Sequence, residues 1–331
     1  MAVPPLRYLS EEDVRGAMPP VEERLALARQ TMVALVDSAE LPPKLGVHPR
    51  QPASLTSAMP ALLRGSDSAG ATDLLGIKWV TAFPGNGALG LPQIHATVVL
   101  NDPITGIPIA ILDGGAITAQ RTAAISGVAL QEWWPKLDRP AAVTVVGAGV
   151  QGASHVGVLV HIAPGALLTI ADRQADRAED LATHAGDTGV FGEVISTTEV
   201  AEAVSDADVV LTMISFGPKR QTVHASAFSH ATLIVSVDYD MCVPGAVVAT
   251  SRIFLTDDID QLEATRTSTV FAGYPRPDAS IGQALVGSAP AFRATGPIVV
   301  NHLGVGLADV VFADAIVRRA VEMGIGTELP R

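Results

Sequence analysis

The spacing of apolar residues changes twice along this chain of 331 residues, near residue 54 and near residue 141. Before the first change the spacing is helical. Ser10 followed by three acidic residues is typical of a capped helix start. A longer helix is predicted between Pro20 and Leu41. Its apolar face repeats every three to four positions, at Val21, Leu25, Ala28, Met32, Leu35 and Val36.

Between residues 54 and 113 the pattern favours strands. Runs rich in β-forming residues cover Leu75–Ala82, Ile94–Leu100 and Pro108–Leu112. Turn-forming residues separate them, at Pro84–Gly87 and at Asn101–Gly106. Short strands joined in this way predict a mostly antiparallel sheet. A helix is expected to follow from Ala116 to Trp134, because Pro135 would stop it.

Beyond residue 141, apolar strands alternate with helices. The predicted strands cover Ala142–Val146, Leu167–Ala171, Val190–Ile195, Asp208–Ile214 and Thr232–Val237. Helices are predicted from the glycine-rich turn to about His161 and over Asp176–His184, and a last amphipathic helix spans Leu307–Met323. Alternation at this spacing is typical of a doubly wound parallel sheet.

These patterns predict an α/β protein with two domains, which fits a length beyond that of one hydrophobic core. Residues 121–304 are expected to form a domain with a doubly wound parallel sheet of the Rossmann type. Residues 1–120 together with 305–331 are expected to form a second, α+β domain.

Composition and charge exclude several classes of partner. Lys and Arg total 22 against 34 Asp and Glu, a formal charge of −12, so binding to nucleic acid or to an anionic membrane is not expected. The uncharged stretch from Pro140 to Ala171 is interrupted by glycines and a proline, which favours buried strands over a membrane-spanning helix. The single cysteine, Cys242, rules out an internal disulfide, and the N-terminus lacks a secretory pattern. A cytoplasmic protein is therefore expected.

The segment from Gly147 to Gly152 carries the pattern G-x-G-x-x-G. It follows a predicted strand and opens a predicted helix, and an acidic residue, Asp172, stands 20 residues after Gly152. This context is the one that a dinucleotide-binding turn requires. The alternative is a glycine-rich loop that binds nothing. The residues of the turn expected to contact the dinucleotide are Gly147, Ala148, Gly149, Val150, Gln151 and Gly152.

The choice between NAD and NADP depends on the residues after the second strand. Asp172 is expected to accept hydrogen bonds from the ribose hydroxyls, which favours NAD. Arg173 and Arg177 weaken this preference, because an arginine at this place holds the extra phosphate of NADP. NAD is the predicted cofactor and NADP stays possible.

Two cations lie in otherwise apolar elements. Lys78 stands in the strand Leu74–Val80, and Arg121 stands in a helix of small residues. A lysine on a solvent-facing strand edge is the plainer interpretation of Lys78 alone. Because a buried cation is costly without an anion, two of them in one domain indicate that a carboxylate is held between them.

The segments around these cations resemble the ornithine cyclodeaminase/mu-crystallin family. The resemblance covers most of the chain, from about Met59 to the last helix. It is carried by Lys78-Trp79-Val80, Gly90-Leu91-Pro92, Thr105-Gly106, Arg121-Thr122-Ala123-Ala124 and Gly147-Ala148-Gly149-Val150-Gln151. The resemblance implies a homodimer whose N-terminal region and last helix form the substrate-binding and dimerisation domain.

It also implies roles for individual residues. Lys78 and Arg121 would hold the substrate carboxylate, and Lys44 would stand where the family often has an arginine of the same clamp. An aspartate after the fifth Rossmann strand would face the substrate nitrogen; Asp240 is the expected match and Asp238 the alternative. Ser215 and Arg173 complete the expected cofactor contacts.

One departure from the family pattern bears on the substrate. Ornithine cyclodeaminases have a glutamate just before the Met-Pro pair, and Ser57 occupies that region here, beside Ala58-Met59-Pro60. The predicted function is therefore an NAD(P)-dependent oxidoreductase that acts on the carbon–nitrogen bond of a small α-amino or α-imino acid. A cyclodeaminase that releases ammonia and a non-catalytic nucleotide-binding protein are the alternatives.

Histidines do not change this prediction. His48, His95, His155 and His302 lie near the motifs, but no pair has the spacing of metal ligands on one helix, and no metal is expected. His95 is expected to pack in the interior, and a position facing the substrate cavity is the alternative. The turn from Asn301 to Gly306 resembles the family's closing turn, which approaches the nicotinamide end of the cofactor.

Overall fold

The structure, a computed structural model, describes residues 4–331 except 52, 67–69, 71 and 218. The chain divides into two compact units. The first comprises the described residues of Met1–Arg121 and Val305–Arg331, and the second comprises those of Thr122–Gly304. The sequence predicts a boundary after residue 120, one residue before the boundary after Arg121 that the structure shows.

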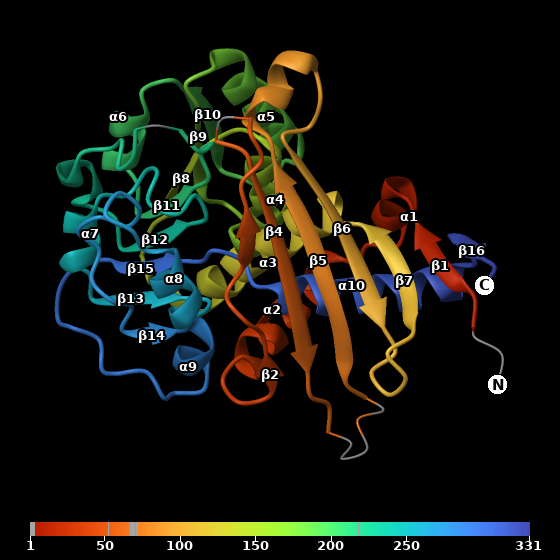
Figure 1. Ribbon diagram of the computed structural model, residues 1–331. Coiled ribbons are helices and arrows are strands. Elements are labelled where there is room, and N and C mark those ends of the chain that lie inside the picture. The colour runs from red at the N-terminus through yellow and green to blue at the C-terminus, as the bar shows by residue number, and fades with distance from the viewer. Residues whose placement is uncertain (1–3, 52, 67–69, 71, 218) are drawn as a thin grey trace. The chain divides into compact units, whose positions relative to one another are not determined.

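The first unit is built on a mostly antiparallel sheet, as predicted. Its strand order is β16-β1-β7-β6-β5-β4-β2, with β3 also paired to β4. Only the β1–β7 pair is parallel among these described pairings. The strands are β1 (Leu6–Leu9), β2 (Ala39–Glu40), β3 (Leu45–Val47), β4 (Leu55–Leu63), β5 (Leu74–Ala82), β6 (Ile94–Asn101), β7 (Pro108–Asp113) and β16 (Thr327–Leu329). Figure 1 shows β4, β5, β6 and β7 as the long central strands.

Helices of the first unit start where the sequence predicts. Helix α1 (Glu11–Gly16) has a capping box, in which Ser10 and Asp13 exchange side-chain and backbone hydrogen bonds. Helix α2 (Val21–Ala34) ends earlier than its apolar spacing suggests. The chain turns after Ala34 so that β2 pairs with β4, and Val36 is left 39% exposed. A short 3-10 helix, η1 (Pro84–Leu89), joins β5 to β6.

The last helix, α10 (Gly306–Met323), packs across β4, β5 and β6 and against α2 (Figure 1). Its first residue allows a close approach to the sheet, because a Cβ on Gly306 would lie 2.5 Å from the Met59 carbonyl oxygen. Met59 stands opposite Lys78 in the β4–β5 pairing. The start of α10 is therefore fixed against the Met59–Lys78 residue pair of the sheet.

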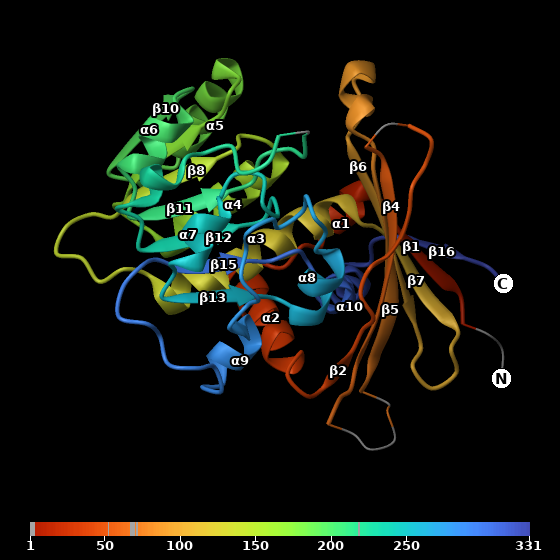
Figure 2. The same ribbon diagram turned by 60° about the vertical axis from the view of Figure 1, so that its left-hand side comes forward.

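The second unit contains an eight-stranded sheet with the order β10-β9-β8-β11-β12-β15-β13-β14. Every described neighbour pair in it is parallel. The strands are β8 (Ala142–Val146), β9 (Leu167–Ala171), β10 (Glu193–Thr197), β11 (Val209–Thr212), β12 (Leu233–Ser236), β13 (Ile253–Thr256), β14 (Ala279–Ser280) and β15 (Ile298–Asn301). Figure 2 shows β8, β11, β12, β15 and β13 in succession. This order confirms the doubly wound fold.

Helices connect these strands. Helix α3 (Gly115–Trp133) runs from the first unit into the second. The others are α4 (Val150–Ile162), α5 (Ala175–Asp187), α6 (Val200–Ser205), α7 (Gly245–Ala249), α8 (Ile259–Thr265), α9 (Ile281–Leu285) and the 3-10 helix η2 (Ala225–Phe228). Strand order reverses at β8, whose neighbours are β9 and β11. Open α/β sheets bind ligands at such a reversal, beyond the carboxyl ends of the strands.

Candidate active site

The two predicted cations of the first unit are buried and share one anion. Lys78 on β5 is 1% exposed and Arg121 on α3 is 4% exposed. The Lys78 Nζ lies 2.6 Å from Oδ2 of Asp309, and the Arg121 Nε lies 3.1 Å from its Oδ1. Asp309 belongs to α10 and is fully buried. Both cations therefore sit in the interior, not on a solvent-facing edge.

Burial decides the charge state of Lys78. It lowers the pKa of the Lys78 ammonium to about 7, because a charged group is poorly solvated in the interior. Asp309 opposes this effect, whereas the positive charges of Arg121 and Lys44 add to it. Three cations around one carboxylate leave an excess of positive charge, and a further carboxylate would balance part of it.

Asp309 is the residue that sequence reasoning missed. It stands in the apolar run Leu307–Ala313, as Lys78 and Arg121 stand in apolar elements of their own. The signal that identified the two cations, a single charge where the pattern demands apolar residues, was therefore present. Because α10 lies far along the chain, nothing in the spacing connects it to β5.

Lys44 and Ser57 lie on elements next to Lys78. Lys44 immediately precedes β3, and it is close enough to lower the Lys78 pKa. Ser57 on β4 is 4% exposed and stands two residues before Met59, which faces Lys78 across the strand pair. Alternate residues of a strand share a face, so Ser57 lies on the Lys78 side of the sheet.

The glycine turn of the second unit has the expected geometry. Gly147 adopts φ +112°, where a side chain is strained, and a Cβ on it would lie 2.7 Å from the Met213 carbonyl oxygen. A Cβ on Gly152 would lie 2.2 Å from the Gly147 carbonyl oxygen. Gly149 differs, because no heavy atom of the described residues, its own chain neighbours aside, lies within 4 Å of a Cβ placed there. Two glycines are thus required by the fold, whereas the third leaves open space.

That open space suits a phosphate. Gly149 is the N-cap of the 13-residue helix α4 and makes no side-chain cap, so the first backbone N–H groups of α4 are directed outward. Asp172, just after β9, accepts from the Ala148 N at 2.9 Å and from the Gln174 N at 2.9 Å. Each carboxylate oxygen retains a second lone pair for a ribose hydroxyl. The residues present therefore fit a dinucleotide.

Other predicted cofactor contacts lie at the same edge of the sheet. Arg173 follows Asp172 and is exposed. Ser215 follows β11 and is also exposed. Because all the described strand pairs of the second unit's sheet are parallel, the turns after β8, β9 and β11 meet at one edge.

The two aspartates after β12 are buried and held by the protein itself. Asp240 is fully buried, forms an ion pair with Arg220, and accepts a hydrogen bond from the Phe271 N at 2.8 Å. Tyr239 and Phe271, which flank these contacts, have φ of +62° and +59°. Such left-handed backbone is unusual for aromatic residues and is found at functional sites. Sequence reasoning did not identify Arg220 as a partner.

Asp238 is held by three donors. It accepts from the Ser236 Oγ at 2.9 Å, from the Thr212 Oγ1 at 3.1 Å and from the Ile214 N at 3.1 Å. Burial nevertheless raises the pKa of the Asp238 carboxyl to about 6, while these hydrogen bonds oppose the shift. Both aspartates lie beyond the end of β12.

The histidines form no metal site among the described residues. In the second unit, the Ser126 Oγ lies 2.8 Å from Nε2 of both His155 and His302. Burial lowers the pKa of His155 to about 4, so its ring is neutral near pH 7. His95 is exposed, with its Nε2 3.4 Å from the Asn86 Nδ2. The expectation that His95 packs in the interior is wrong, because it lies near the start of β6, on the face of the sheet opposite to Lys78.

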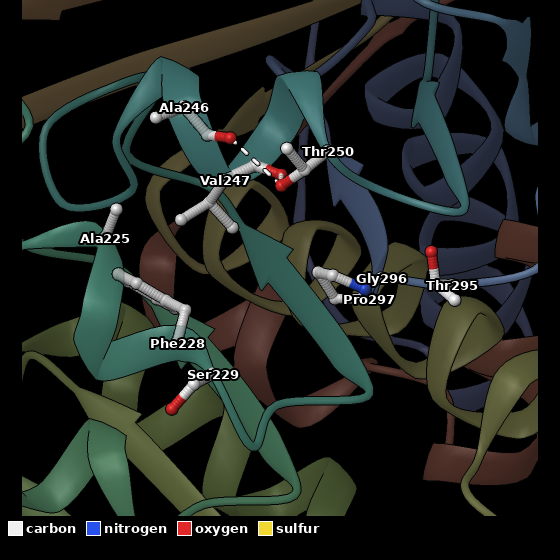
Figure 3. A pocket seen from close by; sticks show the side chains of 9 residues that line it. All are labelled: Ala225, Phe228, Ser229, Ala246, Val247, Thr250, Thr295, Gly296 and Pro297. Atoms are coloured by element: carbon white, nitrogen blue, oxygen red, sulfur yellow. Dashed lines mark hydrogen bonds between the residues drawn. The ribbon is translucent and has the colours of Figure 1, made fainter.

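A pocket of about 300 Å³ lies elsewhere in the second unit (Figure 3). Its described lining comprises Ala225, Phe228, Ser229, Ala246, Val247, Thr250, Thr295, Gly296 and Pro297. None of these residues is ionisable or among the predicted site residues. This pocket is therefore not a candidate for binding a carboxylate or a pyrophosphate. No helix within the described residues is long and apolar enough to span a bilayer.

The fold and site define a two-unit α/β protein with a dinucleotide-binding sheet and a separate buried cation pair. The chain belongs to the ornithine cyclodeaminase/mu-crystallin family, which it matches over residues 9–322. It is 32% identical to the nodulation efficiency protein NfeD of Rhizobium meliloti, over 98% of each chain.

Solved structures share this fold. An archaeal alanine dehydrogenase dimer with bound NAD superposes with a TM-score of 0.83 at 23% identity, over 98% of this chain and 99% of that one. The Δ1-pyrroline-2-carboxylate reductase of Thermococcus litoralis, in complex with NADH and L-proline, gives 0.79 at 22% identity, over 97% and 99%.

Proposed function

We propose that this protein is an NAD-dependent oxidoreductase that reduces the carbon–nitrogen double bond of a small α-imino acid, or oxidises the corresponding amino acid. The observation that carries the proposal is the buried group of Lys78, Arg121 and Asp309, in a family member that also has a dinucleotide-binding turn. The names of the two solved relatives, an alanine dehydrogenase and a pyrroline-2-carboxylate reductase, describe chemistry of this kind.

In the proposed reaction the first unit binds the acid. The Lys78 ammonium and the terminal nitrogens of the Arg121 guanidinium hold the substrate carboxylate, with Lys44 adding positive charge. Asp309 engages Arg121 through Nε, which leaves the two terminal nitrogens for a bidentate contact. Fixing the carboxylate restricts the position of the α-carbon, and such orientation supplies much of the rate in a two-substrate reaction.

The second unit binds the dinucleotide at the turn from Gly147 to Gly152, with Asp172 on the ribose. A bound NADH would supply the hydride for the substrate α-carbon. The imine nitrogen has to carry a proton for this reduction, and we propose that Asp240 stabilises the iminium charge or exchanges that proton, with Asp238 as the alternative. For Asp240 this requires the partly exposed Arg220 side chain to turn away from it. Asp240→Asn and Asp238→Asn variants, compared by kcat at saturating substrate, distinguish the two.

The substrate side chain is expected to lack a distal amino group. Ser57 is neutral and cannot pair with the second ammonium of ornithine or lysine, which disfavours the cyclodeaminase alternative.

A substrate panel tests the proposal. Cyclic imino acids, keto acids with ammonia or methylamine, and amino acids are each assayed with NADH or NADPH, or with their oxidised forms. Imine reduction predicts loss of NADH absorbance with a cyclic imino acid. A cyclodeaminase would instead release ammonia from ornithine or lysine without net NADH production. Dinucleotide binding with no turnover on any substrate would favour the non-catalytic alternative and overturn the proposal.

We also propose that the protein is a homodimer that uses the outer face of the first unit's sheet. Leu45, Ala58 and Trp79 stand opposite one another across β3, β4 and β5, and Leu45 and Trp79 are 62% and 46% exposed. A solvated sheet face normally carries polar residues, so this apolar face indicates a partner surface. Trp79→Glu is expected to yield monomers in sedimentation, whereas Ile195→Glu, at an exposed position of β10, is expected to leave the dimer intact.

We place the protein in the cytoplasm, because a pyridine-nucleotide reaction and a single buried cysteine both fit a reducing compartment.

A further inference from the structure

Asp309 is a fully buried carboxylate at the first turn of α10, in a helix whose neighbouring residues are apolar. Removing a charge of this kind from water is costly, so the fold retains it only with strong partners. Those partners are Lys78 and Arg121, and Asp309 gives one oxygen to each. The proposed function gives Asp309 no contact with the substrate, because its two oxygens face cations that the protein itself supplies.

We propose that Asp309 is a positioning residue that favours the protonated form of Lys78 only in part and aligns it with Arg121, so that binding of the substrate carboxylate is coupled to uptake of a proton. This inference rests on the proposed function, in which Lys78 and Arg121 bind the acid. It adds a residue that does not touch substrate and a proton that the binding step consumes.

Geometry gives the first argument. Because each oxygen of Asp309 binds a different cation, a single rigid carboxylate sets the separation and direction of both side chains. Its own position is fixed by the start of α10, where Gly306 lies against the Met59 carbonyl. A longer or shorter side chain at position 309 would move Lys78 relative to Arg121.

Charge gives the second argument. The charged groups that face Lys78 are Asp309 from α10, Arg121 from α3 and Lys44 from the segment before β3. Asp309 is the only anion among these described groups. The Lys78 pKa of about 7 is therefore the balance of burial and two cations against one carboxylate. A second carboxylate beside Lys78 would raise this pKa.

The coupling of acid binding to proton uptake follows from the directions of these shifts in the Lys78 pKa. Burial and the two neighbouring cations lower the Lys78 pKa in the free protein, and a bound carboxylate beside it raises that pKa. Binding of an acid at a pH between the two pKa values therefore takes up a proton, and affinity for the acid falls as pH rises through that range. Without the charge of Asp309, the Lys78 pKa falls further, and the loss of affinity begins at lower pH.

The chain offers a direct measurement, because it contains only four lysines: Lys44, Lys78, Lys136 and Lys219. In full-length protein labelled with ¹³C at the lysine ε-carbon, the Lys78 signal is assigned by its absence from Lys78→Met. The titration is followed by NMR in the wild type, in Asp309→Asn and in Asp309→Glu. It is repeated with pyrrole-2-carboxylate, a planar acid, and with its neutral carboxamide.

The proposal predicts a wild-type midpoint near pH 7, a midpoint about 1 to 3 units lower in Asp309→Asn, and recovery toward the wild type in Asp309→Glu. Pyrrole-2-carboxylate is expected to raise the wild-type midpoint, and the carboxamide is expected to leave it unchanged. The pH profile of kcat/KM is expected to shift with the midpoint, an effect that loss of packing alone would not produce.

A Lys78 midpoint near 10, or an unchanged midpoint in Asp309→Asn, would overturn the proposal. If Asp309→Asn does not fold, the wild-type titration with acid and carboxamide decides the question. The NMR measurement needs no turnover, so its failure is separate from that of the proposed function. Turnover with an unresponsive Lys78 rejects the role of Asp309 alone, whereas a responsive Lys78 without turnover on any imino acid rejects the reductase.

Discussion

In the proposed function the two units recognise anions in different ways. The first unit uses buried side chains, with Lys78 and Arg121 aligned by Asp309. The second unit uses main chain, with outward N–H groups at the start of α4 and open space at Gly149. A site of the first kind depends on charge and therefore on pH, whereas a site of the second kind depends on backbone shape. Substitutions can separate these two dependences.

The comparison also explains why one site is local and the other is not. The glycine turn lies within a few residues of one strand–helix junction. The cation site joins β5, α3 and α10, whose residues 78, 121 and 309 are far apart in sequence. A single substitution in β5, α3 or α10 can therefore disturb the cation site without touching the glycine turn.

The largest effect is expected from Lys78→Met. This change keeps an apolar stem in the interior but removes the ammonium from the substrate carboxylate and from Asp309. We expect kcat/KM for an imino acid to fall by about 10³-fold or more, equivalent to about 4 kcal/mol of transition-state stabilisation. NADH affinity, measured by fluorescence titration, is expected to stay within about twofold, because the dinucleotide turn contains no residue of the cation site.

Lys136→Met is the matched control, because Lys136 is exposed and lies after α3. It is expected to retain wild-type kcat/KM. Equal turnover in the two variants would remove Lys78 from the mechanism.

The second largest effect is expected from Gly149→Ala in the glycine turn, which should change NADH affinity without changing thermal stability. Gly149→Ala places a methyl group where, its chain neighbours aside, no atom of the described residues lies within 4 Å, so the melting temperature is expected to match the wild type. NADH affinity is expected to fall by about 100-fold, because the methyl group occupies the space proposed for the pyrophosphate. Calorimetric titration measures the affinity and a thermal melt measures the stability.

Gly152→Ala is the comparison, since its methyl group would lie 2.2 Å from a backbone oxygen. It is expected to lower the melting temperature as well as the affinity. Normal NADH binding by Gly149→Ala would show that the turn does not hold the phosphates as proposed.

A third prediction concerns the ionisable group at the end of β12. Burial raises the pKa of Asp238 to about 6 in the folded state, above its ordinary value of 3.8. The folded state therefore binds the proton more tightly, and this contribution to stability is present below pH 4 and is lost as pH rises through 6. The two pKa values differ by about 2 units, which corresponds to roughly 2 to 3 kcal/mol.

Asp238→Asn isolates that contribution. Its amide can still accept from the Ile214 N, and the hydroxyls of Ser236 and Thr212 can rotate to meet the NH₂ group. Urea unfolding at pH 4 and pH 7 is expected to show a smaller change in unfolding free energy for the variant than for the wild type. Parallel pH dependences in the two proteins would contradict the raised pKa.

The smallest effect is expected from Asp172→Ser, which tests cofactor choice. Loss of the ribose contact is expected to weaken NADH binding by about 10-fold, near 1.4 kcal/mol. NADPH binding is expected to improve relative to NADH, because the carboxylate no longer repels the 2′-phosphate and Arg173 and Arg177 remain nearby. The ratio of the two dissociation constants is the readout, and an unchanged ratio would exclude Asp172 from the ribose site.

Much of the second unit could be predicted from the sequence, because its signals are local. The strands Ala142–Val146 and Leu167–Ala171 appear with the predicted bounds, and the glycine turn joins the first of them to α4. The order of later strands could not be predicted. β15 inserts between β12 and β13, and this depends on tertiary packing that apolar runs do not encode.

In the first unit the sequence identified Lys78 and Arg121 but not what holds them. A lone charge in an apolar element is visible in one sequence, and it marked both cations. Their pairing with Asp309 is a contact between β5, α3 and α10, and no spacing rule relates such distant positions. The same limit hid β1 and β16, which pair residues from the two ends of the chain. Arg220 was missed because an ion pair between two loops leaves no periodic pattern.

Isotope transfer tests the central claim most directly. The protein is incubated with a cyclic α-imino acid and NADH that carries deuterium at C4 on both faces, and the product is examined by mass spectrometry and NMR. We predict one deuterium on the α-carbon of the amino acid formed, and about 10³-fold less of this deuterated product from Lys78→Met at the same low substrate concentration. Product without deuterium at the α-carbon, or no product from any α-imino acid tried, would contradict the account.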